Sequence, residues 1–592
     1  MEKVTSGFWA VIVCLLPLQF AVADSCPGQI RGGWETELPV SALFKITLEL
    51  ERLADGEFTA RLVSGGVAED IDVWRDAGSL RLQSGRSAIA FEGRLSSDGQ
   101  TIDGFVDFAS SLYRISLAAK HSNLWSGEWS PVPLVADSVY FDLYFDDDGA
   151  GGTGGYFFFR DDRMPSLYGL GVRCLSTGIE VREKNLGLSL VGEFDDDFSE
   201  FRVTVSAPGR DSSIVFTPMS RERQVMIPGT SALPPRISGA STYAGRAPEE
   251  TGDGWRTAAP SDTGVNIEPL IKMVADVVRG ELPKTHSILV ARSGRLIVEE
   301  YFYGFDRDMI HDMRSASKSL ASTLAGLAVD RGLIEGADAR VLPFFTGYRS
   351  YRSWDPRKAV ISLRHLMTMS SGLDADDSDP DSVAAEGAYQ SQSARSDWIK
   401  LALDAPMIAD PGTRLIYGGA NPLVLGGVLA KVVGNSVEWF ADEALFRPLG
   451  IDTYRIAMDP MGIPYMGGGM HLRPRDMLKI GQMYLDHGRW QGRQILSRPW
   501  VEESFGSYGR LEPLDRNGNE YGYLWWHEHY VINGRRIDSV EARGNGGQYI
   551  FIVPELKVAA VMTSGNYRGG LTMTRQPQRI FERYVLPALV RQ

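Results

Sequence analysis

Ser315 and Lys318 are the two residues of this chain whose types and spacing most directly suggest chemistry. They lie in the stretch Arg-Ser-Ala-Ser-Lys at 314–318, which is followed by leucines at helical spacing and by Gly332 as a stop. We therefore expect Ser315 at the entrance of a helix and Lys318 one turn further along, on the same face. Backbone N–H groups at a helix start can stabilise an oxyanion. A lysine at this spacing can act as the base for a nucleophilic serine if burial lowers its pKa.

Serine acylation also needs a second proton carrier, and Tyr417 is the candidate. It opens the segment Tyr-Gly-Gly-Ala-Asn at 417–421, just after the turn Asp-Pro-Gly at 410–412. A tyrosine held near a lysine ammonium can have its pKa lowered toward neutrality and can then shuttle the serine proton. The alternative is that Tyr417 is a half-buried packing residue.

A third segment, Glu-Ala-Arg-Gly-Asn-Gly-Gly-Gln at 541–548, precedes an apolar strand at 549–553. Glycines such as Gly546 and Gly547 let a substrate lie close to the backbone. A backbone N–H from Gly547 or Gln548 could complete an oxyanion hole with that of the nucleophile. The alternative is an ordinary hairpin.

Composition limits the class of partner. The chain has 592 residues, enough for two or three domains, and a formal charge of −14. That charge argues against nucleic acid or an anionic membrane as the main partner.

Aspartate clusters at 146–148 and 195–197 lack the spacing of a calcium loop, and the His-Glu-His stretch at 527–529 lacks a third ligand nearby. We therefore expect no metal and no organic cofactor. The sequence leaves the oligomeric state open.

The N-terminus predicts a secretory signal at 1–23. Lys3 supplies the positive charge, residues 8–21 form a short apolar run, and Ala-Val-Ala precedes Asp24 as a cleavage site. The apolar run is too short and too broken for a confident membrane span. We expect an exported protein, periplasmic or secreted, with no transmembrane segment after cleavage. An uncleaved anchor is the alternative.

Two cysteines remain after signal removal, because Cys14 leaves with the signal. Cys26 and Cys174 are then a candidate disulfide in an oxidising compartment. Two buried free thiols are the alternative.

Residues 24–235 read as an all-β region. Alternation of apolar and polar residues, with Asp-Gly turns between the runs, predicts a series of short strands. These strand-like runs are Phe44–Leu50, Phe58–Val63, Ala88–Leu95, Tyr113–Leu117, Val139–Phe145, Tyr156–Arg160, Phe201–Val205 and Ile214–Thr217.

A weak internal repeat of about 95–100 residues lies within this β region. Gly33-Trp34-Glu35 recurs as Gly-Glu-Trp at 127–129, and Phe-Glu-Gly-Arg-Leu at 91–95 recurs as Leu-Val-Gly-Glu-Phe at 190–194. The repeat predicts two small β subdomains, either barrels or sandwiches, or one duplicated barrel. Chance similarity among strands is the alternative.

The pattern changes after a linker or irregular lead-in at 236–265. A helix at 270–278 and a hairpin of Ser287–Ala291 with Leu296–Glu300, turning at Ser293-Gly294, are followed by mixed helices and strands to residue 592. Residues 374–396 are acidic, small and polar, which predicts a long loop. The segment 266–592 is therefore expected to be an α+β domain.

In this order, the three chemistry-bearing segments resemble the serine beta-lactamase and penicillin-binding-protein superfamily. The resemblance covers residues from about 243 to the C-terminus. Further segments are similar to its beta-lactamase-related serine hydrolases, around 6-aminohexanoate-dimer hydrolase and the class C-like carboxylesterases. These further segments are Gly252-Asp253-Gly254-Trp255, His311-Asp312-Met313-Arg314-Ser315, residues 361–373 and Arg475-Asp476-Met477.

The resemblance implies an antiparallel sheet flanked by helices, preceded here by the all-β region, and a role for each matching residue. Ser315 would be the acylated nucleophile, Lys318 its base or proton relay, and Tyr417 the second general acid/base. Asn421 matches the asparagine of a Tyr-x-Ser-x-Asn segment. Asn545, Gly546, Gly547 and Gln548 would line the substrate and oxyanion positions.

Two departures from the family pattern narrow the function. Asn545 or Gly544 stands where the family usually has Lys or His, a cation that binds a substrate carboxylate, and Gly419 replaces the serine. The resemblance assigns His365 to a structural helix rather than to a triad. The sequence thus predicts an exported serine hydrolase acting on a neutral ester, an amide or a short peptide. The alternatives are a non-catalytic binding or sensor protein, and a D-Ala-D-Ala carboxypeptidase or penicillin-binding protein.

Overall fold

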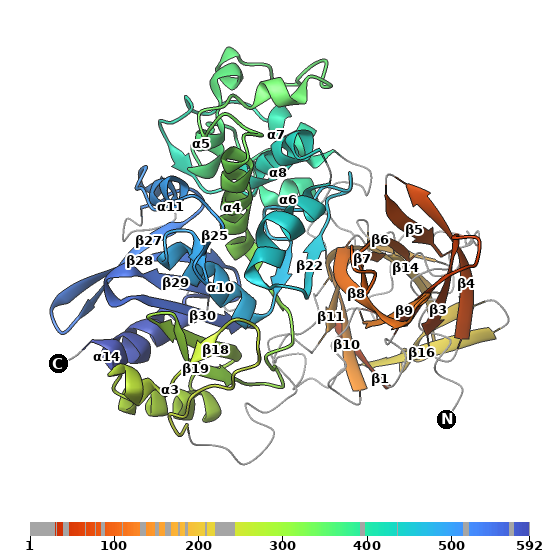
Figure 1. Cartoon of the computed structure of the whole chain (residues 1–592). Helices are drawn as coiled ribbons and strands as arrows, with labels where there is room; N and C mark the ends of the chain where they lie inside the picture. The colour runs from red at the N-terminus through yellow and green to blue at the C-terminus, as the bar shows by residue number, and fades with distance from the viewer. Residues whose placement is uncertain are drawn as a thin grey trace. The chain divides into compact units, whose positions relative to one another are not determined.

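The chain divides into two compact units, residues 1–232 and 233–592 (Figure 1). In this computed structural model the described residues are 30, 32–39, 46–64, 67–76, 78–84, 89–108, 111–130, 138–147, 153–159, 167–175, 178–183, 188–207, 210–218, 243–390, 397–434, 436–512, 520–567 and 574–590. The expected signal segment 1–23 lies outside them, so its cleavage stays a prediction.

The first unit contains a closed antiparallel barrel in which each strand pairs with the next along the chain. The last strand, Leu124–Trp129, pairs with both the first and the seventh, which closes the ring. Alternate residues of the strands point inward and form one apolar core. The strands are β2 (Ile46–Arg52), β3 (Phe58–Ser64), β4 (Val67–Asp76), β5 (Ser79–Gln83), β6 (Ala90–Leu95), β7 (Thr101–Phe108), β8 (Ser111–His121) and β9 (Leu124–Trp129).

A second closed barrel of the same unit takes its closing strand from the N-terminus. Strand β1 pairs along its whole length with β10 and also with β16, so the first barrel is inserted between two strands of the second. Trp34 of β1 is buried in this barrel, where its ring packs edge-on to Phe194 at 5.0 Å. The strands are β1 (Gly32–Pro39), β10 (Ser138–Asp147), β11 (Thr153–Phe159), β12 (Leu167–Cys174), β13 (Gly178–Glu183), β14 (Leu188–Phe194), β15 (Phe201–Ala207) and β16 (Arg210–Pro218).

The sequence repeat coincides with equivalent strands of the two barrels. The pair 91–95 and 190–194 lies in β6 and β14, and the pair 33–35 and 127–129 lies in the closing strands β1 and β9. The segments 91–95 and 190–194 share a glycine, and the reason is the same in both: a phenylalanine ring packs over its backbone. A Cβ on Gly93 would lie 2.4 Å from the Phe91 ring, and one on Gly192 would lie 2.6 Å from the Phe201 ring. Each of the two sets of strands therefore closes into a ring, which is one of the arrangements that the repeat predicted.

Cys174, at the end of β12, is buried and disulfide-bonded. It is the only cysteine of the chain among the described residues. Its pairing with Cys26, which lies outside those residues, stays a prediction.

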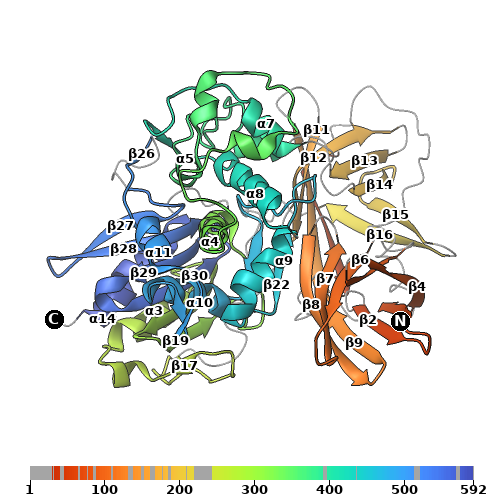
Figure 2. The same ribbon diagram turned by 45° about the horizontal axis from the view of Figure 1, so that its top comes forward.

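The second unit is built on a sheet of order β17-β19-β18-β30-β29-β28-β27, antiparallel except for its β17–β19 edge. Helices α3, η9 and α14 share one apolar core with a face of this sheet, and α10 packs on the sheet through Gly481, where an added Cβ would lie 2.8 Å from the Ile550 side chain (Figures 1 and 2). The predicted hairpin forms β18 and β19, with positive φ at Ser293 and Gly294. The bounds are β17 (Arg256–Thr257), β18 (Thr285–Arg292), β19 (Arg295–Tyr301), β27 (Trp526–Ile532), β28 (Arg535–Gly544), β29 (Gln548–Val553), β30 (Val558–Ser564), α3 (Glu268–Val278), α10 (Pro474–Leu485), η9 (Phe581–Val585) and α14 (Leu586–Leu589).

The other part of this unit is largely helical and carries short strands. Helix α4 is buried over most of its length and packs against α8. Within the described ranges, no single helix is long and apolar enough to cross a membrane; Ala420–Val432 together with Val437–Leu449 passes that test as a pair bent by 90°. The main elements are β20 (His311–Asp312), η3 (Arg314–Ala316), α4 (Ser317–Asp330), α5 (Leu363–Met367), α6 (Glu386–Gln390), α7 (Trp398–Asp404), β21 (Leu415–Ile416), α8 (Ala420–Val432), α9 (Val437–Ala441), β22 (Tyr454–Ala457), β23 (Met470–Leu472), α11 (Arg498–Ser504) and α13 (Gln576–Ile580).

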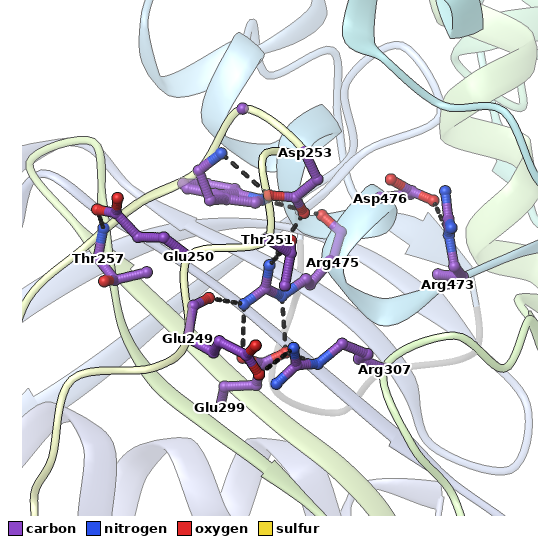
Figure 3. Close-up of polar contacts among 12 residues, drawn as sticks. Glu249, Glu250, Thr251, Asp253, Thr257, Glu299, Arg307, Arg473, Arg475 and Asp476 are labelled. Atoms are coloured by element: carbon purple, nitrogen blue, oxygen red, sulfur yellow. Dashed lines mark hydrogen bonds and ion pairs between the residues drawn. The ribbon is translucent and has the colours of Figure 1, made fainter.

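Arg475 of α10 joins two of the segments that carried the family resemblance (Figure 3). Its guanidinium, 4% exposed, forms a two-bond pair with Glu299 at 2.7 and 2.7 Å and contacts Asp253 at 3.2 Å. It also donates to the Thr251 hydroxyl and to the Glu249 carbonyl, both at 2.7 Å. The lead-in around 249–255 is therefore fixed to the helix and sheet by one buried cation, which gives these segments a structural role.

Candidate active site

Ser315 lies in the single turn η3 that leads into α4, as the apolar spacing predicted. The turn is fixed by Asp312, whose carboxylate accepts from the Arg314 N–H at 2.8 Å and pairs with the Arg314 side chain at 2.8 Å. Arg314 has a φ of 48°, a left-handed conformation that a non-glycine residue adopts at a cost, directly before the nucleophile candidate. The helix that follows brings Lys318 to the same face.

Lys318 is buried, and its ammonium group contacts the nucleophile candidate directly. Nζ donates to Ser315 Oγ at 2.8 Å and to the Gly467 carbonyl at 2.7 Å, with 1% of the residue exposed. The Tyr417 ring centre lies 5.1 Å from the same Nζ. The structure thus brings together all three residues predicted to be catalytic.

The condition under which Lys318 could act as the base, a pKa lowered by burial, is not met. Burial does push this pKa down, but the negative potential of Tyr417, Glu386 and Asp377 outweighs it, so the pKa is raised above its ordinary value. Lys318 is therefore an ammonium ion at neutral pH. It donates to the Ser315 oxygen and cannot accept its proton in this state.

Tyr417 is placed by β21, which ends one residue before it, and by α8, which begins three residues after it. Its ring packs against Trp526 at 5.4 Å and edge-on to Tyr521 at 6.4 Å. Asn421, in the first turn of α8, is buried. Its amide donates to Met369 Sδ at 3.5 Å, and its Oδ1 has no hydrogen-bond partner within the described part of the chain.

The third motif approaches the nucleophile through a glycine. A Cβ on Gly544 would lie 2.2 Å from the Met313 carbonyl and 3.2 Å from the Ala316 nitrogen, so only glycine allows the end of β28 to lie against η3. Gly546 and Gly547 have φ of 83° and 97° and make the turn into β29.

The remaining residues of the third motif differ in what they offer a substrate. The Gly547 N–H donates to Gly544 O at 3.2 Å within the turn, which leaves the Gln548 N–H as the candidate oxyanion donor. The Gln548 side chain is fully buried and bonds to the backbone of Ser564, so its part is structural. Asn545 is exposed and carries no charge.

Arg543, two residues before Asn545, is a cation close to the site, but its charge is already paired. It contacts Glu541 at 2.8 Å and Glu528 at 3.1 Å, and it stacks over Trp526 at 4.9 Å. A substrate carboxylate would have to compete with two carboxylates for this group. Arg543 therefore does not stand in for the cation that the family pattern has near position 545.

The segment 374–390, expected to be part of a long loop, contains helix α6 and contributes to the site. Residues 391–396 of the expected loop lie outside the described ones. The Tyr389 hydroxyl fills the position beside Gly419 where the resembling proteins carry a serine, since a Cβ there would lie 2.3 Å from it. Asp377 accepts from the Gly419 N–H at 2.8 Å. Sequence reasoning missed both residues; the only signal was the glycine at 419.

Two histidine assignments can be compared with the structure. His365 lies in α5 as predicted, and its Nδ1 accepts from the Ser362 N–H at 3.2 Å in a capping box, which is a structural role. His527 and His529 lie in strand β27 as predicted.

Comparison with known proteins gives one family and several relatives. The Beta-lactamase family model matches residues 284–581, just over half of the chain. The 6-aminohexanoate-dimer hydrolase of Paenarthrobacter ureafaciens is 25% identical over 328 residues, which cover 52% of this chain and 79% of that protein. Monacolin J acid methylbutanoyltransferase of Aspergillus terreus is 30% identical over 211 residues, 33% of this chain and 48% of that protein. Among solved structures, EstCE1, a hydrolase with promiscuous acyltransferase activity, has a TM-score of 0.42 and 20% identity, covering 53% of this chain and 97% of that one.

Proposed function

Because the chain belongs to the beta-lactamase family of serine hydrolases, we propose that it cleaves an ester or amide through an acyl-enzyme on Ser315. The observation that carries the proposal is the 2.8 Å contact between the buried Lys318 ammonium and Ser315 Oγ, with the Tyr417 ring centre 5.1 Å from the same ammonium. Two segments remote in sequence meet at this point, and the third motif lies against the turn that carries Ser315 through Gly544.

The proposed reaction begins with attack of Ser315 Oγ on the substrate carbonyl while the Ser315 proton passes to the phenolate form of Tyr417, which becomes a neutral tyrosine. The Lys318 ammonium stabilises the negative charge that develops during this transfer. The carbonyl oxygen becomes an oxyanion, held by the N–H groups of Ser315 and Gln548. Tyr417 then gives the proton to the leaving group, and water releases the acyl group by the reverse steps.

A neutral substrate is favoured over an anionic one. Asn545 supplies no charge, Arg543 is paired with two carboxylates, and Asp377 and Glu386 add negative potential beside Lys318. A beta-lactam or peptide carboxylate would lack the charge-assisted bonds that are each worth about 1.5–3 kcal/mol. We propose a neutral ester, an amide or a short peptide as substrate, and export to the periplasm or medium as the location.

Labelling with a fluorophosphonate tests the nucleophile. We expect one adduct by intact mass, located on Ser315, and none in Ser315→Ala. Hydrolysis of short-chain p-nitrophenyl esters should fall by several powers of ten in this variant and by at least about 10²-fold in Tyr417→Phe. Tyr508→Phe, a change of the same type at a tyrosine outside the site, is the control and should leave both readouts unchanged.

The same assays separate the alternative functions. Absence of any adduct on the folded wild-type protein would favour a binding or sensor protein. Faster acylation by penicillin than by the ester would favour a carboxypeptidase or penicillin-binding protein. Relatives named as acyltransferases make it useful to add an alcohol acceptor and measure transfer against hydrolysis.

A further inference from the structure

Two carboxylates on the segment 374–390, here called the acidic strap, lie next to the proposed catalytic residues. They are Asp377 and Glu386, and both act electrostatically on the buried Lys318 ammonium. The strap belongs to none of the three motifs. The acidic strap nevertheless contacts the segments that hold the two proton-carrying side chains, Lys318 and Tyr417.

Asp377 holds the loop that carries Tyr417. Its backbone N–H donates to the Tyr417 carbonyl at 3.1 Å, and its Oδ2 accepts from the Gly419 N–H at 2.8 Å. The loop passes so close to the strap that a Cβ on Gly418 would lie 1.8 Å from the Ala375 carbonyl oxygen. The residues on both sides of Gly418 are therefore fixed by one aspartate.

Glu386 reaches the other proton carrier through a tyrosine. Tyr465 donates to Glu386 Oε1 at 2.5 Å, and the Tyr465 and Tyr389 hydroxyls are 2.8 Å apart. A Cβ on Gly467 would lie 2.5 Å from the Tyr465 hydroxyl, so that glycine packs against it. The Gly467 carbonyl is the second acceptor of the Lys318 ammonium.

The two carboxylates also influence each other. The Glu386 N–H donates to Asp377 Oδ1 at 2.7 Å. Burial, followed by the negative charge of Glu386, raises the pKa of Asp377 to about 7, although Lys318 and the two N–H donors act in the opposite direction. Burial and the charge of Glu386 also raise the pKa of Tyr389 and of Tyr465, so both tyrosines stay neutral hydrogen-bond donors.

We propose that Asp377 and Glu386 are positioning residues that keep Lys318 as an ammonium ion and hold Tyr417 as the acceptor of the Ser315 proton. The proposal deepens the proposed function and rests on it for the role of Tyr417. The groups that face Lys318 are Ser315, Tyr417, the Gly467 carbonyl and the two carboxylates. The charged pair on the other side of the nucleophile, Asp312 with Arg314, is satisfied internally at 2.8 Å.

A direct titration of Lys318 tests the electrostatic part. In protein labelled with ¹³C at the lysine ε-carbon, the Lys318 resonance is assigned by its loss in Lys318→Arg and followed with pH. We expect Asp377→Asn with Glu386→Gln to lower its pKa by about one unit, because nearby negative charges favour the ammonium form and the double variant removes two of them. The control is Asp381→Asn, which removes an exposed charge of the same strap. An unchanged Lys318 pKa in the double variant overturns the proposal.

The rate of fluorophosphonate labelling against pH tests the link to chemistry. The rate should fall at high pH as Lys318 loses its proton, and this alkaline limb should move to lower pH in the double variant but not in Asp381→Asn. With p-nitrophenyl esters, Asp377→Asn should lower kcat more than it raises KM. If the double variant is labelled but the alkaline limb of its labelling rate lies at the same pH as in the wild type, the positioning role is contradicted. An unlabelled wild-type protein contradicts the proposed function instead, while the Lys318 titration still decides the electrostatic claim. Circular dichroism establishes that each variant is folded.

Discussion

At the scale of single residues, Gly419 and Tyr389 form a complementary pair. The Tyr389 hydroxyl occupies the space beside Gly419, at 2.3 Å from the position of a Cβ, and its own partner is Tyr465. The φ of Gly419 is −63°, so a side chain is excluded by space and not by backbone conformation. The glycine is therefore explained by a tyrosine from a distant part of the chain.

A double-mutant cycle measures this complementarity. Gly419→Ser should lower the free energy of unfolding by about 1–3 kcal/mol, the usual cost of overpacking a buried position. In a Tyr389→Phe background the same serine should cost markedly less, because the hydroxyl that it meets is gone. Urea denaturation of the four proteins gives the coupling energy. Additive effects of the two changes would contradict the steric explanation.

His471 makes stability depend on pH. It lies in β23, and burial lowers its pKa to about 3, with Arg455 and Arg314 acting in the same direction and Asp312 against them. The folded protein therefore keeps this ring neutral at a pH where the unfolded chain, with an ordinary pKa of about 6.5, binds a proton. The stabilisation is complete above about pH 6.5 and is lost as the pH falls toward 3.

Between pH 7.5 and pH 5 we expect His471 to account for a fall of about 2 kcal/mol in the free energy of unfolding. His471→Gln should show a correspondingly smaller fall over the same interval. The matched control is the exposed His487→Asn, which should keep the wild-type dependence. Identical pH dependence in wild type and His471→Gln would show that the ring does not stay neutral in the folded state.

The sequence was sufficient to predict that Ser315, Lys318 and Tyr417 would lie together, but not the charge state of Lys318 or the residues of the segment 374–390 that surround them. Ser315, Lys318 and Tyr417 could be identified because each lies in a local pattern. The protonation of Lys318 depends on Asp377 and Glu386, which come from a segment whose small acidic residues look like a solvated loop. Long-range electrostatics of this kind leaves no trace in local spacing.

At the scale of elements, α10 and the lead-in segment depend on one ion cluster. Arg475→Met would remove the two-bond cation from the carboxylate of Glu299, 4% exposed at its side chain, and leave it the Tyr301 hydroxyl at 2.8 Å and Arg307 at 4.0 Å. We expect a loss of about 3–5 kcal/mol in the free energy of unfolding, as for other broken buried pairs. Proteolysis should also become faster around 249–255, where Thr251 and Asp253 lose their contacts.

The control for this prediction is Arg498→Met. Arg498 forms a pair with Glu502 at 2.7 Å, but its side chain is 65% exposed. Removing such a surface pair should cost only about 0.3–0.5 kcal/mol. Equal effects at the two positions would refute the structural role assigned to Arg475.

Elements with strong periodicity were predicted from the sequence, and weakly patterned ones were not. Helix α3, the hairpin of β18 and β19, and the strands around Phe44–Leu50 and Val139–Phe145 were all expected close to where they occur. Strand β4 was missed because Glu69 interrupts the alternation of Val67, Ile71 and Val73, and because three aspartates give the segment the composition of a solvated loop. This strand forms because it pairs with β3 and β5 within the closed ring, which its own composition does not predict.

At the scale of the whole molecule, the two barrels should differ in whether each can fold as an isolated fragment. The pairings that close the ring of the first barrel lie within 46–130, whereas the second ring needs β1 from outside 138–218. We expect fragment 46–130 to show β-type circular dichroism and cooperative unfolding. Fragment 138–218 should not, until a synthetic peptide of residues 30–39 is added. A scrambled peptide is the control, and cooperative unfolding of 138–218 alone would contradict the prediction.

The insertion of one barrel between two strands of the other has a consequence for the order of folding during synthesis. Strand β1 leaves the ribosome first. At about 5–20 residues per second, β16 does not follow until about ten to thirty seconds later. The first barrel can close in that interval, because its contacts are sequential. Strand β1 meanwhile carries unpaired backbone groups, which are a template for pairing with another chain. Closure of the second barrel is thus the late, slow event of this unit, and a nascent β1 can be captured by the β10–β16 sheet of a second molecule before its own sheet exists.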